Sequence, residues 1–176
     1  MNQRNGNQKN NRFDSRKVAY AVVLVAIGVI LAPYTSFPIG IAKVNPTQHF
    51  VNVIGAVVLG PWWAVIIACV IGVIRNAMGV GTLLAFPGGM IGAFIAGYFY
   101  RLKPNVYLAA SGEILGTGFI APVVSALLVA PVLMNKAIPL IALIPSFLVS
   151  TVAGAILGVL ALKLLKRADI LKPEGS

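Results

Sequence analysis

Five stretches of this 176-residue chain contain no acidic or basic side chain, and each is long enough to cross a membrane. They cover residues 18–42, 50–74, 76–100, 114–135 and 137–162. A helix needs about 20 apolar residues to span a hydrocarbon core of about 30 Å. Charged residues form 10% of the chain, whereas a soluble domain has about 25%. The sequence therefore predicts an integral membrane protein.

Helices rather than strands are predicted for these stretches. A transmembrane β-barrel would alternate apolar and polar residues in segments of about ten, but these stretches are uniformly apolar. Residues 18–39 lack an A-x-A-like site followed by polar chain, so we do not expect a cleaved signal peptide. The predicted fold class is thus an all-α membrane protein.

The number of spans depends on residues 50–74, which Gly60-Pro61 divides. As one helix, this stretch would be kinked at the proline. As two, it would be a hairpin of short helices with Trp62 and Trp63 at the turn, and tryptophan favours the membrane surface. With six spans both tails are cytoplasmic, and the inside carries eleven basic residues, nine in the tails plus Arg101 and Lys103, against three outside. The positive-inside rule therefore favours six.

The predicted helices cover residues 17–37, 46–59, 61–75, 87–100, 105–134 and 138–166. They form a six-helix membrane domain, 17–167, between a basic N-terminal tail, 1–16, predicted to be disordered, and a cytoplasmic C-terminal tail, 168–176. We expect Pro122 and Pro131 to bend the fifth helix. Small residues at four-residue spacing, such as Gly88, Gly92 and Ala96, predict close helix packing.

The net charge of +10 comes mainly from basic residues beside the first and last spans. Such clusters set the orientation of a membrane protein and contact anionic lipid. The expected surroundings are therefore a lipid bilayer, in the cell membrane, and nucleic acid is not an expected partner.

A polar stripe begins the second predicted helix. Asn45, Gln48, His49 and Asn52 are spaced i, i+3, i+4 and i+7, which is one face of a helix. Asn45 suits the N-cap and Pro46 the first helical position, so both a capping role and a ligand contact stay open for Asn45. For Gln48, His49 and Asn52 we predict a ligand-facing wall, with purely structural hydrogen bonding as the alternative.

Two further regions carry candidate site residues. The connection 74–89 holds Arg75, Asn76 and Phe86, and we expect it to fold over a pocket with Phe86 as an aromatic wall. The alternative is a plain connection in which Arg75 reaches lipid head groups. Glu113 is the only acid in the membrane body, roughly 13 Å into its helix, with Thr117 one turn on. It must pair, be protonated or bind a ligand; Arg75 and His49 are the alternative internal partners.

Several kinds of chemistry lack the residues they need. The chain has no G-x-x-x-x-G-K-[ST] sequence for nucleotide phosphates. One histidine, one cysteine and one acid in the membrane body do not make a typical catalytic zinc site. We therefore expect neither an enzyme nor a bound metal or cofactor.

Three segments together resemble one family. "KVNPTQHFVNVIGAVVLGPWWA", "RNAMGVGTLLAFPGGMIGAFIAG" and "GEILGTG" are similar to the ThiW family, the thiazole-type substrate-binding (S) components of energy-coupling factor (ECF) transporters. The resemblance covers roughly residues 17–165. It implies a six-helix bundle that captures the thiamine precursor hydroxyethylthiazole on the outside. It also implies docking onto the membrane coupling protein EcfT, which carries two ATPase subunits that use ATP.

The resemblance has one departure and leaves two matters open. Many S components carry an A-x-x-x-A motif on helix one for docking to EcfT, but none occurs here. The ligand could also be the pyrimidine precursor or thiamine itself. The alternative function is a self-sufficient channel or proton-coupled carrier with Glu113 and His49 as a proton relay. The small residues that could form the docking face are Ala19, Ala21, Ala26, Gly28 and Ala32.

Overall fold

The computed structural model describes residues 15–40 and 42–168, so most of both predicted tails lies outside the described residues. Six helical rods follow one another along the chain, and each begins and ends within two residues of its predicted position. They are α1 (Ser15–Thr35), α2 (Pro46–Leu59), α3 (Pro61–Ala77), α4 (Ala85–Leu102), a composite helix (Val106–Leu133) and α8 (Leu140–Arg167).

The composite helix alternates between two helical forms. It consists of α5 (Val106–Leu115), the π-helical η1 (Gly116–Ile120), α6 (Ala121–Val124), the π-helical η2 (Ser125–Val129) and α7 (Ala130–Leu133). Pro122 and Pro131 each follow one π-helical segment. A proline has no N–H to donate, and its ring clashes with the carbonyl one turn back. The wider π turn makes room for the ring, so these prolines alter the helix without ending it.

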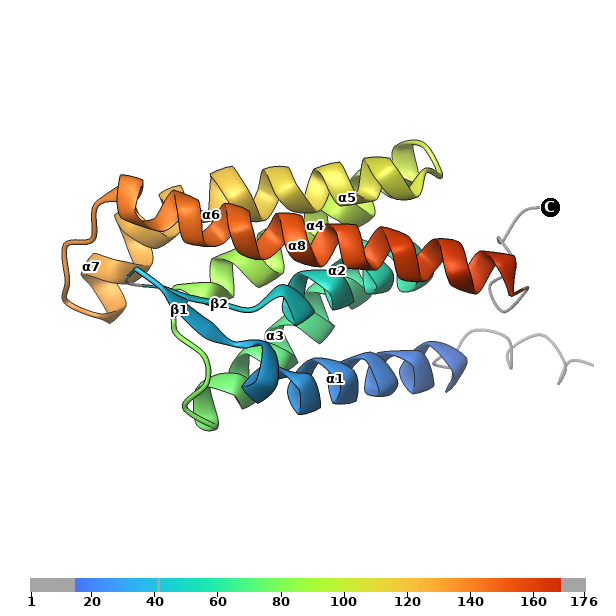
Figure 1. The fold of residues 1–176 in the computed structure, drawn as a ribbon, viewed down its shortest axis with the longest axis horizontal. Helices are drawn as coiled ribbons and strands as arrows, with labels where there is room; N and C mark the ends of the chain where they lie inside the picture. The colour runs from blue at the N-terminus through green and yellow to red at the C-terminus, as the bar shows by residue number, and fades with distance from the viewer. Residues whose placement is uncertain (1–14, 41, 169–176) are drawn as a thin grey trace, which may run out of the picture.

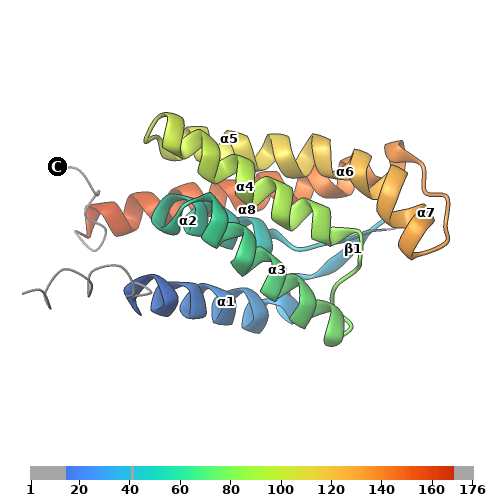
Figure 2. The same cartoon turned by 180° about the vertical axis from the view of Figure 1, so that it is seen from behind.

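Both ends of the described chain lie at one end of the bundle (Figures 1 and 2). We call this the terminal end; it also holds the turn between α4 and α5. The opposite, loop end holds the α3–α4 connection, the α7–α8 connection and a short β-hairpin. The helices α1, Val106–Leu133 and α8 are long and apolar enough to cross a membrane, while α2 and α3 are shorter apolar helices.

Helix α2 lies at the centre of the bundle. It contacts α1, α3, α4, α5 and α8, and 10 of its 14 residues are buried. A helix surrounded by other helices does not face lipid, so its polar side chains can bond to protein groups. This position explains how a polar stripe is tolerated on a short apolar helix.

Small residues bring α4 close to both of its neighbours, as their spacing predicted. A Cβ atom added to Gly97 would lie 2.5 Å from Pro61 Cα of α3. One added to Gly112 of α5 would lie 2.8 Å from the Ile95 carbonyl oxygen, and one at Gly116 would lie 2.8 Å from Gly92 Cα. Since no side chain fits in such gaps, the helix backbones themselves are in contact.

A β-hairpin corrects the prediction of a purely α-helical chain. Strand β1 (Phe37–Ile39) pairs antiparallel with β2 (Ala42–Val44), with Phe37 opposite Val44. Gly40 begins the turn with φ +59°, a conformation that glycine adopts without strain. The sequence predicts helix to residue 37 and no strand between the helices 17–37 and 46–59. A three-residue strand is too short to show a period of two in the sequence.

Candidate functional site

The N-terminus of α2 is tied to both α1 and α8 through Asn45. Its Oδ1 accepts a hydrogen bond from Gln48 N at 2.8 Å, which makes Asn45 the N-cap, and Pro46 is the first helical residue. Asn45 Nδ2 donates to Ser36 Oγ at 2.6 Å, and Asn45 N donates to Ser150 Oγ at 2.9 Å. The cap therefore fixes where the polar stripe of α2 faces, and the predicted capping role is confirmed.

The buried carboxylate of Glu113 collects polar groups from two helices. Its Oε1 lies 2.8 Å from His49 Nδ1 and 3.0 Å from Asn52 Nδ2, both on α2. Thr117 Oγ1, one turn further along the composite helix, lies 2.9 Å from the same oxygen and 2.8 Å from the Gly88 carbonyl oxygen. The other oxygen, Oε2, has no hydrogen-bond partner. This cluster satisfies the alternative in which Glu113 has an internal partner, and that partner is His49.

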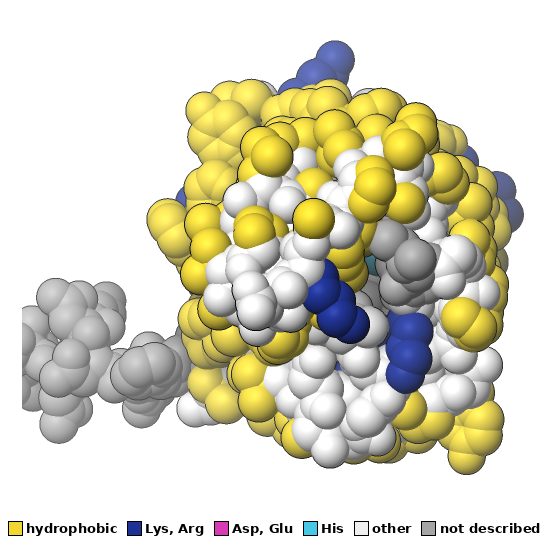
Figure 3. Space-filling view, turned by 90° about the vertical axis from the view of Figure 1, so that its left-hand side faces the viewer, with side chains coloured by type: hydrophobic (Ala, Val, Ile, Leu, Met, Phe, Trp, Pro, Cys, Tyr) yellow, Lys and Arg dark blue, Asp and Glu magenta, His cyan; other side chains and the backbone are white. Residues whose placement is uncertain are grey.

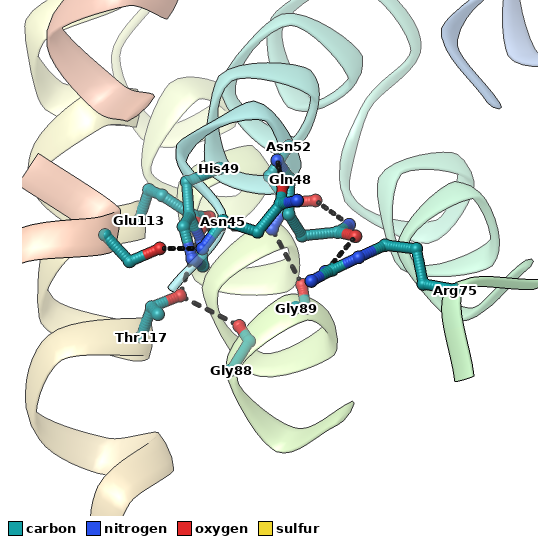
Figure 4. Close-up of polar contacts among 10 residues, drawn as sticks. Asn45, Gln48, His49, Asn52, Arg75, Gly88, Gly89, Glu113 and Thr117 are labelled. Carbon is teal, nitrogen blue, oxygen red and sulfur yellow. Dashed lines mark hydrogen bonds and ion pairs between the residues drawn. The ribbon is translucent and has the colours of Figure 1, made fainter. Parts of the chain in front are cut away.

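Two amide side chains connect this cluster to Arg75 (Figure 4). Arg75 Nη1 lies 3.4 Å from Gln48 Oε1, and Gln48 Nε2 donates to Asn52 Oδ1 at 3.2 Å. Asn52 Nδ2 in turn donates to Glu113 Oε1 and to the Gly89 carbonyl oxygen. Each amide accepts on the arginine side and donates on the carboxylate side. The three polar residues of the stripe thus belong to one hydrogen-bond network that spans α3, α2 and the composite helix.

A cavity of about 30 Å³ opens beside this network at the loop end. Figure 3 shows this end of the molecule, where polar and backbone surface surrounds a hollow with basic side chains beside it. The β-hairpin is attached here by two hydrogen bonds. Lys43 Nζ donates to the Gly79 carbonyl oxygen at 2.8 Å, and Ser146 Oγ donates to the Ile39 carbonyl oxygen at 2.7 Å. The lining comes from β2, the α2 N-terminus, α3, the α3–α4 connection, α4 and α8. It consists of Lys43, Asn45, Gln48, His49, Arg75, Thr82, Ala85, Gly88, Ser146, Phe147 and Ser150.

The structure divides the predicted substrate-binding residues into three groups. Gln48, His49 and Arg75 line the cavity. Three residues are buried behind the cavity and are connected to its lining through hydrogen bonds: Asn52, Glu113 and Thr117.

Asn76 and Phe86 do not line the cavity, which corrects their predicted place. Asn76 Nδ2 donates to the Gly72 carbonyl oxygen at 2.8 Å within its own helix. The Phe86 ring packs against Gly72. The aromatic residue in the lining is instead Phe147 of α8.

Several lining residues were missed from the sequence. Ser146 and Ser150 lie one turn apart on α8 with Phe147 between them. Hydroxyl groups one turn apart in an apolar helix were the available signal. The signal is weak because a serine in a helix can donate its hydroxyl hydrogen bond to the backbone carbonyl one turn back, and then needs no ligand. Lys43 lies in β2 and Thr82 in the α3–α4 connection. How these segments fold over the cavity depends on tertiary contacts.

The predicted docking face on α1 is partly corrected. Ala21, Gly28 and Ala32 are buried within the bundle, and a Cβ at Gly28 would collide with the side chain of Ile71 on α3. Small size serves internal packing at these positions, so they are not free for a partner. Ala19 and Ala26 are exposed.

Comparison with known proteins found a family model and solved structures that match this chain. Residues 18–168 match the model of a family described as thiamine-precursor transporter protein (ThiW). The fold matches a solved structure described as the S component of a bacterial ECF transporter, with a TM-score of 0.72 and 16% sequence identity over 88% of this chain and 97% of that chain. None of the curated proteins matched in sequence.

Proposed function

The chain belongs to the ThiW family of thiamine-precursor transporters, and we propose that it is the substrate-capture subunit of an ECF-type importer for hydroxyethylthiazole. This is a family of transporters, so the chain is a membrane transport protein and not an enzyme. The observation that carries the proposal is the loop-end cavity, where Gln48 and His49 of the predicted wall meet Arg75 from the second candidate region.

The proposed orientation has six spans in the cytoplasmic membrane, with the loop end outside and both tails in the cytoplasm. Its support is the distribution of basic side chains along the described chain. Seven lie at the terminal end and three, Lys43, Arg75 and Lys136, at the loop end. Positive charge is enriched on the cytoplasmic side of membrane proteins. The seven are Arg16, Lys17, Arg101, Lys103, Lys163, Lys166 and Arg167.

The cavity chemistry suits a small ring with a few polar atoms. Phe147, Ala85 and Gly88 offer apolar surface, and Gln48, His49 and Ser150 offer polar groups, which is the usual balance of a small-molecule site. A cavity of about 30 Å³ holds roughly two water molecules. A ring-sized ligand therefore requires the hairpin and the α3–α4 connection to move apart, which would break the bond between Lys43 and Gly79.

Energy for uptake would come from partner subunits. The sequence contains no nucleotide-binding P-loop. We propose that EcfT and two ATPase subunits supply this function and that the exposed Ala19 and Ala26 of α1 belong to the face that meets EcfT.

Calorimetric titration of the purified chain tests the ligand. We expect hydroxyethylthiazole to bind more tightly than thiamine or its pyrimidine precursor. Failure of hydroxyethylthiazole to bind below millimolar concentration, in a sample shown to be folded, would contradict the proposal.

A flux measurement separates capture from independent transport. Proteoliposomes that hold this chain alone should not accumulate hydroxyethylthiazole when a pH gradient is imposed, because a capture subunit needs its ATPase partners. Uptake under these conditions would instead favour a proton-coupled carrier that uses His49 and Glu113.

A further inference from the structure

Arg75 is a buried cation that has no ionic partner among the residues that the structure describes. Arg75 is 2% exposed, and its Nε atom has no hydrogen-bond partner among the described residues. Nη1 and Nη2 lie 3.4 Å from Gln48 Oε1 and 3.5 Å from Ser36 Oγ. These distances are at the long limit for a hydrogen bond, and both acceptors are neutral. A guanidinium group has five N–H donors, so most of its capacity is unused although it lines the cavity.

The cavity carries an excess of positive charge. Lys43 and Arg75 are both in its lining, and no acidic residue is. Within residues 15–40 and 42–168 the only acid is Glu113, which lies behind His49. If His49 is neutral and Glu113 is ionised, the carboxylate offsets the charge of one of the two cations, Lys43 and Arg75. If His49 and Glu113 are both ionised or both neutral, the pair carries no net charge and offsets neither cation. Two cations less at most one anion leave a net charge of at least +1 in every case.

An uncompensated charge that is removed from water is costly, and a ligand that supplies the opposite charge removes that cost. Arginine is well suited to this because its N–H groups can bind two oxygens of a carboxylate or phosphate at once. Lys43 donates one of its three N–H groups to the Gly79 carbonyl oxygen. When that bond breaks to admit the ligand, all three N–H groups can bind the same ligand group.

We infer that the site prefers an anionic derivative of the small ring, with a carboxylate or phosphate monoester held by Arg75 and Lys43, over the neutral alcohol. This inference rests on the proposed function, because it concerns the same capture site. The apolar residues Phe147, Ala85 and Gly88 then face the ring. In the neutral alcohol, the hydroxyl takes the place of the anionic group; it can accept hydrogen bonds from Arg75 and Lys43 but brings no charge to offset theirs.

Three ligands with the same ring test the inference by calorimetric titration of the full-length chain in nanodiscs. They are hydroxyethylthiazole, its phosphate ester, and the acetic acid in which the terminal –CH2OH is oxidised to a carboxylate. At least one anion should bind about tenfold more tightly than the alcohol, and its advantage should shrink as salt is raised. The anion whose affinity exceeds that of the alcohol shows whether the site binds a phosphate or a carboxylate. Equal affinities, or tighter binding of the alcohol, would overturn the inference. Failure of all three ligands to bind would contradict the proposed function instead.

Variants then locate the effect. Arg75→Gln should abolish the preference for the anion, because the affinity for the anion should fall at least about tenfold more than the affinity for the alcohol. Lys136→Gln is the matched control, because Lys136 is an exposed basic residue at the loop end that does not line the cavity; its preference should be unchanged. Retention of the full preference in Arg75→Gln would exclude Arg75 as the anion ligand. If Arg75→Gln does not fold, Lys43→Gln replaces it and should reduce the preference for the anion. The comparison of the three ligands on the wild-type chain tests the inference independently of both variants.

Discussion

At the scale of single residues, Glu113 shows how a carboxylate is accommodated inside an apolar bundle. Its Oε1 lies within 3.0 Å of polar atoms of His49, Asn52 and Thr117. The sequence indicated that this acid needs a partner, because an isolated charge at that depth is costly. Which partner it has depends on how α2 is rotated against the composite helix, and that rotation follows from packing. The packing of the helices also explains why Asn76 and Phe86 do not line the cavity.

The His49 side chain links the cavity to this carboxylate, so its loss should weaken ligand binding. We expect His49→Ala and Asn52→Ala each to lower the affinity for hydroxyethylthiazole by more than about 1 kcal/mol, since each leaves a buried polar group without its partner. Titration of the purified variants measures this. Ser111→Ala, an exposed position on α5 whose hydroxyl bonds only its own helix, is the control and should bind as wild type. Wild-type affinity in both site variants would remove them from the site.

Gly92 is a second residue whose role the network determines. A Cβ there would lie 2.7 Å from Glu113 Oε2, whereas a Cβ at Gly55, also buried in a helix, meets nothing closer than 3.6 Å. Gly92→Ala should therefore lower the free energy of unfolding by about 2 kcal/mol through overpacking. Gly55→Ala should leave it unchanged or raise it by up to about 1 kcal/mol, because alanine favours the helix. Equilibrium unfolding in mixed micelles measures both, and equal effects would contradict the assigned contact.

At the scale of elements, the N-terminus of α2 is the point where three helices and the hairpin meet. Asn45 caps α2, and its other groups bond to Ser36 and Ser150. The Asn-Pro pair predicted the cap from local rules alone. The two remaining bonds could not be predicted, because their partners are 9 and 105 residues away in the chain.

Two asparagine caps in the chain allow this difference to be measured. Asn105 caps α5 through Tyr107 N and is exposed, so Asn105→Ala should cost about 1 kcal/mol of unfolding free energy. Asn45→Ala should cost about 2 kcal/mol or more, because it removes the cap and also the bonds from Asn45 Nδ2 to Ser36 Oγ and the Ala32 carbonyl oxygen. The bond from Asn45 N to Ser150 is made by the backbone and is kept in the variant. Unfolding in mixed micelles compares the two variants. A smaller cost for Asn45→Ala would mean that its side-chain bonds to Ser36 and to the end of α1 contribute little.

At the scale of the whole molecule, both ends of the described chain lie at the terminal end of the bundle (Figure 1). Large hydrophobic side chains are exposed along the outer helices, for example Ile30 of α1, Leu127 of the composite helix and Ile156 of α8. A soluble protein rarely exposes so much apolar surface, but lipid tails are a suitable solvent for it. The shape thus agrees with a bundle that lies across a bilayer.

Labelling in intact cells tests the proposed orientation. With the only cysteine, Cys69, replaced by alanine, Lys136→Cys at the loop end should react with a membrane-impermeant maleimide. Lys103→Cys, between α4 and α5 at the terminal end, should react only after the cells are permeabilised. The reverse pattern would place the loop end in the cytoplasm and invalidate external capture.

The membrane class, the six helices and the start of α2 could all be predicted from the sequence alone. They follow from local properties, namely apolar run length, charge spacing and the preferences of asparagine, proline and glycine. Three features required the folded structure: Phe147 rather than Phe86 lines the cavity, small residues of α1 pack inside the bundle, and Arg75 lines the cavity with no acidic partner among the described residues. Each of these depends on which face of a helix meets a neighbour, and that is set by packing between segments far apart in the chain.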